Sequence, residues 1–193
     1  MEERMHSTNE LQVLVIGVAG AEFGMNITKI QELARYQEVQ RISYSNPCIE
    51  GTVNLRGEVF TVVDLAKYLD LPASNDPEHD ILIIMKFKQE GMAFHVHQAD
   101  SVSRFSWETI ESADSSLCVD KENIVVGAAM LNDRVITLID FDWIMHEIAA
   151  VLEVEAQTSQ DAEISRSNSA ESHLKPFISH GKYSFTDNIS PCP

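Results

Sequence analysis

The first part of the chain alternates short apolar runs with turn residues. Leu11 to Val18 is a near-continuous apolar run rich in β-branched residues, and Gly20 marks a turn. After that turn, every second position is apolar, at Phe23, Met25 and Ile27. The pattern predicts a β-hairpin.

The spacing of apolar residues then changes from two to three or four. Apolar side chains fall at Ile27, Ile30, Leu33 and Ala34, which would share one face of a helix. We therefore expect a short helix that ends before the polar stretch beginning at Tyr36.

Two more hairpins follow. Ile49 to Asp64 reads as two strands joined at Arg56-Gly57, with Asp64 as the N-cap of a short helix. Pro72 to Asp80 has the composition of a linker. Beyond it, the apolar segments Ile81–Phe87 and Met92–Val96 predict another hairpin, with Met92, Phe94 and Val96 on its inner face.

The hairpin-helix unit occurs twice in the chain. Residues 51–69, GTVNLRGEVFTVVDLAKYL, align without a gap to residues 127–145, GAAMLNDRVITLIDFDWIM. Both copies read as strand, tight turn, strand and Asp-capped helix. Short strands, frequent turns and this repeat favour two small β-barrels packed together over a parallel sheet, which needs a long helix after each strand.

Composition changes near residue 151. From there to residue 193 the chain is rich in Glu, Gln, Ser, Asn and Asp, with isolated apolar residues at no steady period. Such a segment buries too little apolar surface to offset the entropy lost on ordering. We expect a flexible N-terminus at residues 1–10, one folded domain at 11–150 and a disordered tail at 151–193.

Charge and composition narrow the classes of partner. The formal net charge is −16, which disfavours nucleic acid and anionic membrane surfaces. The first ten residues have no apolar signal-peptide core, and no apolar run is long enough to span a membrane, so we expect a cytoplasmic protein. The cysteines Cys48, Cys118 and Cys192 are scattered and are interpreted as reduced thiols.

Two pairs of residues are candidates for chemistry or recognition. His95 and His97 would share one strand face and could begin a zinc site completed by His79 or an acid, although a pair of half-exposed histidines is the simpler interpretation. Phe105 and Trp107 would anchor a partner if exposed, and belong to the core if buried. No known catalytic motif is present, so the sequence does not predict an enzyme.

The repeat also points to one arginine. The first hairpin turns through Arg56-Gly57, whereas the second turns through Asn132-Asp133, which is ordinary turn chemistry. Because arginine is not a turn former, Arg56 is a candidate for binding a carboxylate through its planar guanidinium. The alternative is a solvated arginine at a loop tip.

Three stretches carry a resemblance to a known family. FGMNITKIQEL (23–33), NPCIEGTVNLRGEVFTVVDLAKYLDLP (46–72) and GAAMLNDRVITLIDF (127–141) resemble the CheW-like domain of bacterial chemotaxis proteins. Within that family, FHVH (94–97) and RFSWETIE (104–111) are more similar to the N-terminal half of CheV than to CheW. The resemblance covers nearly all of residues 10–150.

The resemblance implies a mostly β fold of two packed SH3-like barrels with short helices, one of them after residue 140. It implies a non-enzymatic cytoplasmic adaptor, recruited to receptor arrays, that couples chemoreceptor tips to the histidine kinase CheA and needs no cofactor. We expect Arg56 to pair with Glu32 in a partly buried, bidentate contact. The expected partner-binding residues are Glu32, Leu33, Asn54, Arg56, Gly57, Val59, Phe105 and Trp107.

Some alternatives remain open at this point. CheV carries a receiver domain, and residues 151–193 have no phospho-acceptor pattern, so we expect a shortened form, a truncated reading frame or a CheW-type adaptor. Other function classes are a metal-binding enzyme that uses His95 and His97, and a structural protein that self-associates through edge strands.

Overall fold

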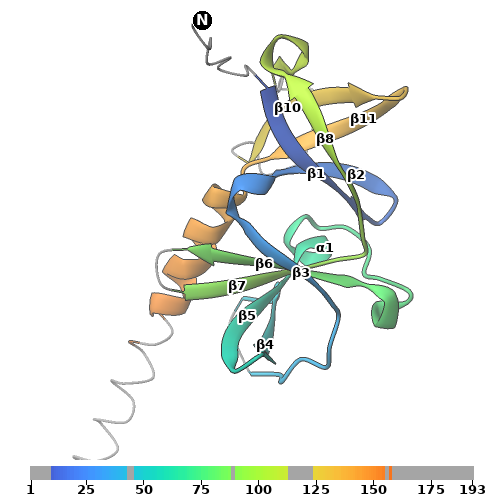
Figure 1. The fold of residues 1–193 in the computed structure, drawn as a ribbon. Helices are drawn as coiled ribbons and strands as arrows, with labels where there is room; N and C mark the ends of the chain where they lie inside the picture. Colours follow the sequence, from blue (N-terminus) through green and yellow to red (C-terminus); the bar gives the residue numbers. More distant parts are fainter. Residues whose placement is uncertain (1–9, 43–45, 88–89, 113–123, 155–156, 158–193) are drawn as a thin grey trace, which may run out of the picture. The chain divides into compact units, whose positions relative to one another are not determined.

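The computed structural model describes residues 10–42, 46–87, 90–112, 124–154 and 157 (Figure 1). Two sheets hold nearly all of the regular structure. In the first the strand order is β8-β1-β2-β11-β10-β9, and in the second it is β3-β6-β7-β5-β4. This agrees with the expected mostly β fold.

Each sheet is built largely from antiparallel neighbours and contains one parallel pair. The first sheet contains β1 (Glu10–Val18), β2 (Ala21–Asn26), β8 (Gln98–Ser106), β9 (Glu111–Ser112), β10 (Val125–Leu131) and β11 (Arg134–Ile139). The second contains β3 (Ile30–Arg35), β4 (Ile49–Leu55), β5 (Glu58–Asp64), β6 (Ile81–Phe87) and β7 (Glu90–Val96). The parallel pairs are β11 with β2 and β5 with β7.

Short connections close each sheet on itself. After β3 the chain runs on to Gln40, which bridges Thr52 on β4 at the opposite end of the sheet order. After β8, the 3-10 turn η3 (Trp107–Thr109) leads into β9, which pairs with β10. We call the closed β3-to-β7 sheet barrel 1, and the sheet formed by β1, β2 and β8 to β11 barrel 2.

Helices are few. The short helix α1 (Leu65–Tyr68) follows β5, and residues 141–154 form a longer helix after β11. Two further 3-10 turns are η1 (Ile27–Lys29) and η2 (Pro77–His79). No described helix is both long and apolar enough to cross a membrane.

The apolar core has three parts. One cluster fills barrel 1, with Phe60, Val62 and Leu82 among its members. A second fills barrel 2 and includes Val13, Ile136 and Leu138. The largest lies between the barrels and takes in both helices, so the two barrels share one buried layer.

The prediction of a helix at Ile27 to Ala34 is wrong. Only η1 is helical, and the chain from Ile30 onward is strand β3, which pairs with β6 through a register shift between Ile30 and Glu32. The apolar spacing of three arises because these residues face different surroundings. Ile27 and Ile30 pack on the core between the barrels, Ala34 packs inside barrel 1, and Leu33 is exposed.

The predicted hairpin-helix repeat is confirmed. Both copies are two antiparallel strands followed by a helix. Each opens with a register shift at its glycine, between Ile49 and Gly51 and between Val125 and Gly127. The helix after residue 140, also expected, continues to residue 154 and places Val151 and Leu152 against the core, and most of the predicted tail lies outside the described residues.

Candidate functional site

The tip of the β4–β5 hairpin carries the predicted binding residues of barrel 1. Arg56 and Gly57 adopt positive φ angles of 54° and 91°, the geometry of a tight primed turn. The Asn54 side chain stabilises it by accepting a hydrogen bond from the Gly57 amide at 2.9 Å. The turn holds the Arg56 side chain out in solvent, where it is 85% exposed.

The predicted pair between Arg56 and Glu32 is confirmed, with a different geometry. Arg56 Nη1 lies 3.1 Å from Glu32 Oε2, but the contact is a single exposed one rather than a partly buried bidentate pair. Glu32 comes from strand β3 and not from a helix. An ion pair of this exposure contributes little to stability.

The other predicted residues divide between exposed and buried positions. Leu33 and Val59 are exposed on the strands of barrel 1. Phe105 is only 5% exposed because it points into the core of barrel 2, and this burial argues against a role in binding. Trp107, two residues later on η3, is 49% exposed. The predicted aromatic pair is therefore one core residue and one surface residue.

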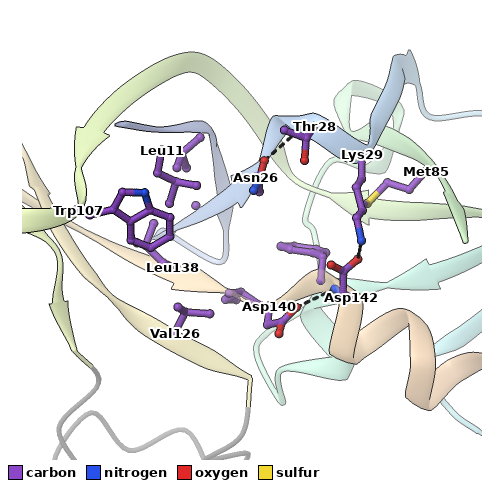
Figure 2. Close-up of a pocket in the computed structure, with 14 residues that line it drawn as sticks. Leu11, Asn26, Thr28, Lys29, Met85, Trp107, Val126, Leu138, Asp140 and Asp142 are labelled. Carbon is purple, nitrogen blue, oxygen red and sulfur yellow. Dashed lines mark hydrogen bonds and ion pairs between the residues drawn. The ribbon is translucent and has the colours of Figure 1, made fainter. Parts of the chain in front are cut away.

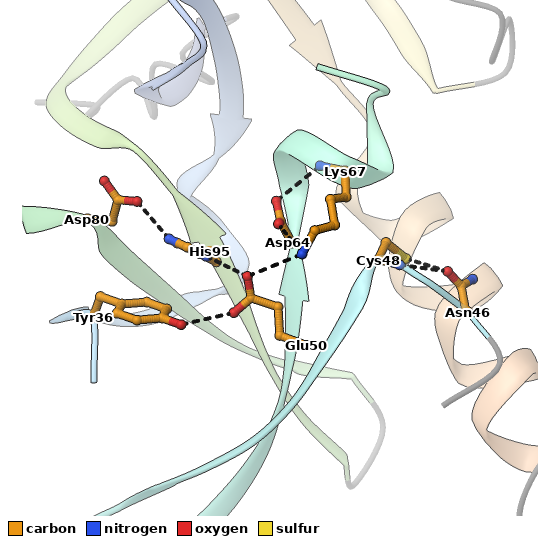
Figure 3. Close-up of polar contacts among 8 residues, drawn as sticks. All are labelled: Tyr36, Asn46, Cys48, Glu50, Asp64, Lys67, Asp80 and His95. Atoms are coloured by element: carbon orange, nitrogen blue, oxygen red, sulfur yellow. Dashed lines mark hydrogen bonds and ion pairs between the residues drawn. The ribbon is translucent and has the colours of Figure 1, made fainter. Parts of the chain in front are cut away.

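A buried polar cluster, which the sequence did not predict, lies in barrel 1 (Figure 3). His95 on β7 is at its centre, with Nδ1 3.0 Å from Glu50 Oε1 and Nε2 2.8 Å from Asp80 Oδ2. The Tyr36 ring packs on the imidazole at a centroid distance of 4.4 Å. The Tyr36 hydroxyl donates to Glu50 Oε2 at 3.2 Å. We call these four residues, together with Asp64 and Lys67, the His95 cluster.

Lys67 supplies the second positive charge of the cluster. Its ammonium lies 2.9 Å from Asp64 Oδ2 and 3.9 Å from Glu50 Oε1. The same Asp64 caps α1 by accepting from the Lys67 amide at 3.0 Å. Asp64 is therefore both the helix cap predicted from the sequence and a member of the cluster.

The surroundings shift the pKa values of several cluster residues. Burial alone lowers the pKa of His95, but hydrogen bonds and charges from Glu50 and Asp80 outweigh it, so the pKa is raised. Burial raises the pKa of Asp64, yet the bonds from Lys67 leave it below its ordinary value. Burial, with the charge of Glu50, raises the pKa of Tyr36 to about 12. An imidazolium between two carboxylates fits these directions.

The two histidines do not form a joint metal site. His95 is buried rather than half-exposed, whereas His97, just past the end of β7, accepts a hydrogen bond from the Ala19 amide at 3.0 Å. Donor atoms of Glu50, Asp64 and His95 do lie within 4.8 Å of one another. However, the Lys67 ammonium is already bonded to two of these side chains. Two protein cations, Lys67 and the imidazolium of His95, thus already pair with the three carboxylates of the cluster.

One signal in the sequence could have revealed this cluster. Extending the repeat by one residue pairs Glu50 with Val126, and within the repeat Lys67 pairs with Trp143. A position that is charged in one copy of the repeat and apolar in the other indicates that the two barrels differ in function there. Asp80 and His95 lie outside the repeat, so only the folded barrel brings them to Glu50.

Comparisons with known proteins agree with this architecture. The CheW-like domain family matches residues 12–149. CheV3 of Helicobacter pylori is 27% identical over 180 residues, which are 86% of this chain and 57% of that protein. CheW of Bacillus subtilis is 27% identical over 148 residues, which are 77% of this chain and 90% of that protein.

A solved structure supports the same fold. The scaffolding protein TtCheW of Thermoanaerobacter tengcongensis superposes with a TM-score of 0.61 and 23% identity, over 67% of this chain and 88% of that one. Two closed sheets with a shared core, and a family match across both, define the class. This chain belongs to the CheW-like domain family.

Proposed function

We propose that this protein is a chemotaxis adaptor that couples chemoreceptors to the histidine kinase CheA at cytoplasmic receptor arrays. The observation that carries the proposal is the family match across residues 12–149, which spans both barrels. An adaptor of this kind needs two separate surfaces, one for each partner. Two barrels with unlike surfaces suit that requirement.

For the contacts themselves, we propose that the receptor tip binds between the barrels and that the kinase binds along a barrel edge. The Arg56 turn, with its exposed ion pair to Glu32 and the exposed Leu33 and Val59 on the same barrel, supports barrel 1 as one of these surfaces. Exchangeable signalling contacts of this type are commonly small, below about 1,200 Å² of total buried area. A few exposed residues can therefore carry much of the binding.

Within the family, we propose that the chain is of the CheV type. The proposal depends on residues 94–97 and 104–111, because the identity to H. pylori CheV3 and to B. subtilis CheW is the same, 27%. The chain spans 57% of that CheV3. The function proposed here concerns the CheW-like part and does not depend on a receiver domain.

The test is reconstitution. The purified chain is mixed with CheA and a receptor cytoplasmic fragment, and the complexes are sedimented and quantified by gel. We expect the chain in the pellet only when a partner is present, and more CheA with the receptor when the chain is added. If light scattering shows self-association alone, and neither partner changes the assembly, the chain is a structural protein and the proposal fails.

A further inference from the structure

Barrel 2 has an open pocket close to the helix that begins at residue 141 (Figure 2). Its volume is about 150 Å³. Its apolar walls include Leu11, Val126, Leu138 and Trp107 of barrel 2, and Met85 on β6 of barrel 1 also lines it. The opposite wall is polar, with Asn26, Lys29, Asp140 and Asp142.

The strand registers show which residues of barrel 1 occupy the equivalent place. Val126 and Asp140 match Glu50 and Asp64 by the repeat. In the parallel pairs, Leu138 is the partner of Gly24 in barrel 2, and Val62 is the partner of Ala93 in barrel 1, so Gly24 and Ala93 are equivalent. Two residues after each of these stand Asn26 and His95, which therefore correspond.

In the antiparallel pairs, Asn26 is the partner of Val13 and His95 is the partner of Leu82, so Val13 and Leu82 are equivalent. Two residues before each of these stand Leu11 and Asp80, which therefore correspond.

This correspondence explains why the two barrel openings differ in chemistry. In barrel 1, Glu50, Asp80 and His95 are joined by bonds of 3.0 and 2.8 Å, and Glu50 also lines a wide polar hollow of about 980 Å³ with Tyr36 and Lys67. Their counterparts Val126, Leu11 and Asn26 make no such links, since two are aliphatic and Asn26 Oδ1 accepts from the Thr28 amide at 3.0 Å. The same backbone thus carries a linked polar cluster in one barrel and a small, mainly apolar hollow in the other.

The size and walls of the pocket indicate one apolar side chain as its occupant. A cavity of about 150 Å³ with apolar walls is large enough to bind benzene, so a single aromatic ring fits. Trp107 and Val126 are about half exposed, at 49% and 48%, and offer a face for such a ring. The exposed cross-strand pair Met130 and Val135 lies elsewhere, because Val135 faces the opposite side of β11 from Leu138. A macromolecule covers the half-exposed Trp107 and Val126 together with the pocket better than a small ligand does.

The charges beside the pocket favour one kind of residue next to that ring in the partner. Lys29 is paired with Asp142 at 2.5 Å, which leaves the Asp140 carboxylate as the excess charge of the polar wall. Asp140 accepts from the Asp142 and Trp143 amides through one oxygen, Oδ1. The chain as a whole carries −16. A basic residue next to the ring is therefore complementary.

We propose that this pocket binds an aromatic side chain with a basic neighbour on the surface of a partner protein. The proposal rests on the adaptor function above and adds a second anchoring point, on barrel 2, to the Arg56 surface of barrel 1. Buried aromatic anchors beside charged groups commonly dominate protein interfaces.

The first test uses three capped dipeptide amides: Phe-Lys, Phe-Glu and Ala-Lys. Amide NMR shifts of the whole chain report binding, and we expect Phe-Lys to move the signals of Leu11, Val126 and Asp142. Phe-Glu should bind about tenfold more weakly, and Ala-Lys should cause no shift at these positions. If Phe-Lys leaves these signals unmoved, or if all three peptides act alike, the proposal is overturned.

The second test fills the pocket. Val126→Phe places a ring in the hollow, while Val135→Phe adds the same ring on the exposed strand outside it. We expect Val126→Phe to abolish the Phe-Lys shifts and to weaken binding of CheA or the receptor fragment about tenfold, with Val135→Phe retaining the shifts. Unchanged affinity of Val126→Phe for both partners, at an unchanged melting temperature, would refute the proposal. Failure of the wild-type chain to bind either partner would instead refute the adaptor function, and the dipeptide result would still decide the pocket.

Discussion

The two barrels use the same backbone devices and differ in the side chains placed on them. At the start of each repeat a glycine lies against a neighbouring strand or its extension. A Cβ on Gly51 would be 2.2 Å from the carbonyl oxygen of Gln40, and one on Gly127 would be 2.5 Å from that of Glu111. At the end of each, an aspartate amide donates to a backbone carbonyl at 2.8 Å, Asp64 to Cys48 and Asp140 to Ile124. The frame is duplicated down to single hydrogen bonds.

The difference lies at the turns and at the barrel openings. Barrel 1 turns through Arg56 and Gly57, and its opening carries the His95 cluster, where Tyr36, Glu50 and Lys67 also line a wide polar hollow. Barrel 2 turns through Asn132 and Asp133, both at positive φ, and its opening is a pocket. A duplicated frame can thus carry two unlike surfaces, as an adaptor with two partners requires.

The order of the strands shows how the barrels are joined. Barrel 1 is built from consecutive strands, β3 to β7. Barrel 2 takes β8 to β11 from the later part of the chain and β1 and β2 from its beginning. Barrel 1 is therefore inserted between two parts of barrel 2, so barrel 2 is not completed until the chain has passed through barrel 1. We expect the two to unfold together.

The largest expected effect comes from the His95 cluster. His95→Ala leaves Glu50 and Asp80 buried without their shared cation, and breaking a buried pair in this way costs about 3–5 kcal/mol of unfolding free energy. The triple variant Glu50→Val, Asp80→Leu and His95→Asn copies barrel 2 and leaves no unpaired charge. It should be more stable than His95→Ala in urea titrations. A triple variant that is the less stable of the two would contradict the comparison.

The pH dependence of stability sharpens this prediction. The pKa of His95 is raised in the folded protein above its value of about 6.5 in the unfolded chain. The contribution of His95 to the free energy of unfolding is therefore complete below about pH 6.5 and is lost as the pH rises through the pKa of the folded state. Tyr36, Glu50, Asp64, Lys67 and Asp80 surround the ring. Wild type should lose stability above about pH 6.5, and the triple variant should lose less. Parallel pH profiles of the two proteins would show that the cluster does not act through His95.

The next largest effect is expected at the glycines of the repeat. Gly51→Ala forces a Cβ into the Gln40 carbonyl and also meets an unfavourable φ of 146°. Overpacking against backbone, with the cost of that φ, gives a loss of about 3 kcal/mol. Gly127→Ala meets the Glu111 carbonyl without the positive φ, so its loss should be smaller. Chemical denaturation of both variants tests the order, and equal losses would show that φ contributes little.

The sequence predicted what depends on local pattern. The hairpins, the Arg56 and Asn132 turns and the Asp64 and Asp140 caps all depend on neighbouring residues, and they are present in the structure. The helix at Ile27 to Ala34 was mispredicted because a bulge produced a false helical spacing. Apart from the difference between Glu50 and Val126 in the repeat, local pattern does not predict the His95 cluster or the pocket, because barrel closure joins residues far apart in the chain, such as Glu50 and His95 at 45 positions.

A moderate effect is expected where the two repeats differ in helix length. The first helix ends at Tyr68, whereas the second continues to residue 154 and packs Leu152 on the shared core. Leu152 is only partly buried, so Leu152→Ala should cost about 1–2 kcal/mol, less than a full core truncation. Deleting residues 158–193 should change the melting temperature by less than about 4 °C. A larger drop on deletion than on substitution would mean that the predicted tail docks.

The smallest expected effect on stability is at the turn that distinguishes barrel 1. Arg56→Ala removes an ion pair whose guanidinium is 85% exposed, so unfolding free energy should fall by less than about 1 kcal/mol. Leu65→Ala, at a fully buried position after the same hairpin, should cost about 2–5 kcal/mol.

The effect of Arg56→Ala on binding should be large, because the exposed guanidinium can bind a partner's carboxylate. We expect Arg56→Ala to weaken the complex with CheA or the receptor fragment about tenfold. Arg134→Ala is the matched control, since Arg134 follows the equivalent turn and pairs with Glu22 on barrel 2. We expect Arg134→Ala to change neither stability nor binding appreciably. If both arginine variants bind like wild type, Arg56 is a solvated turn residue. If Arg56→Ala unfolds the domain, Arg56 is needed for folding. In either case the turn is not the partner surface.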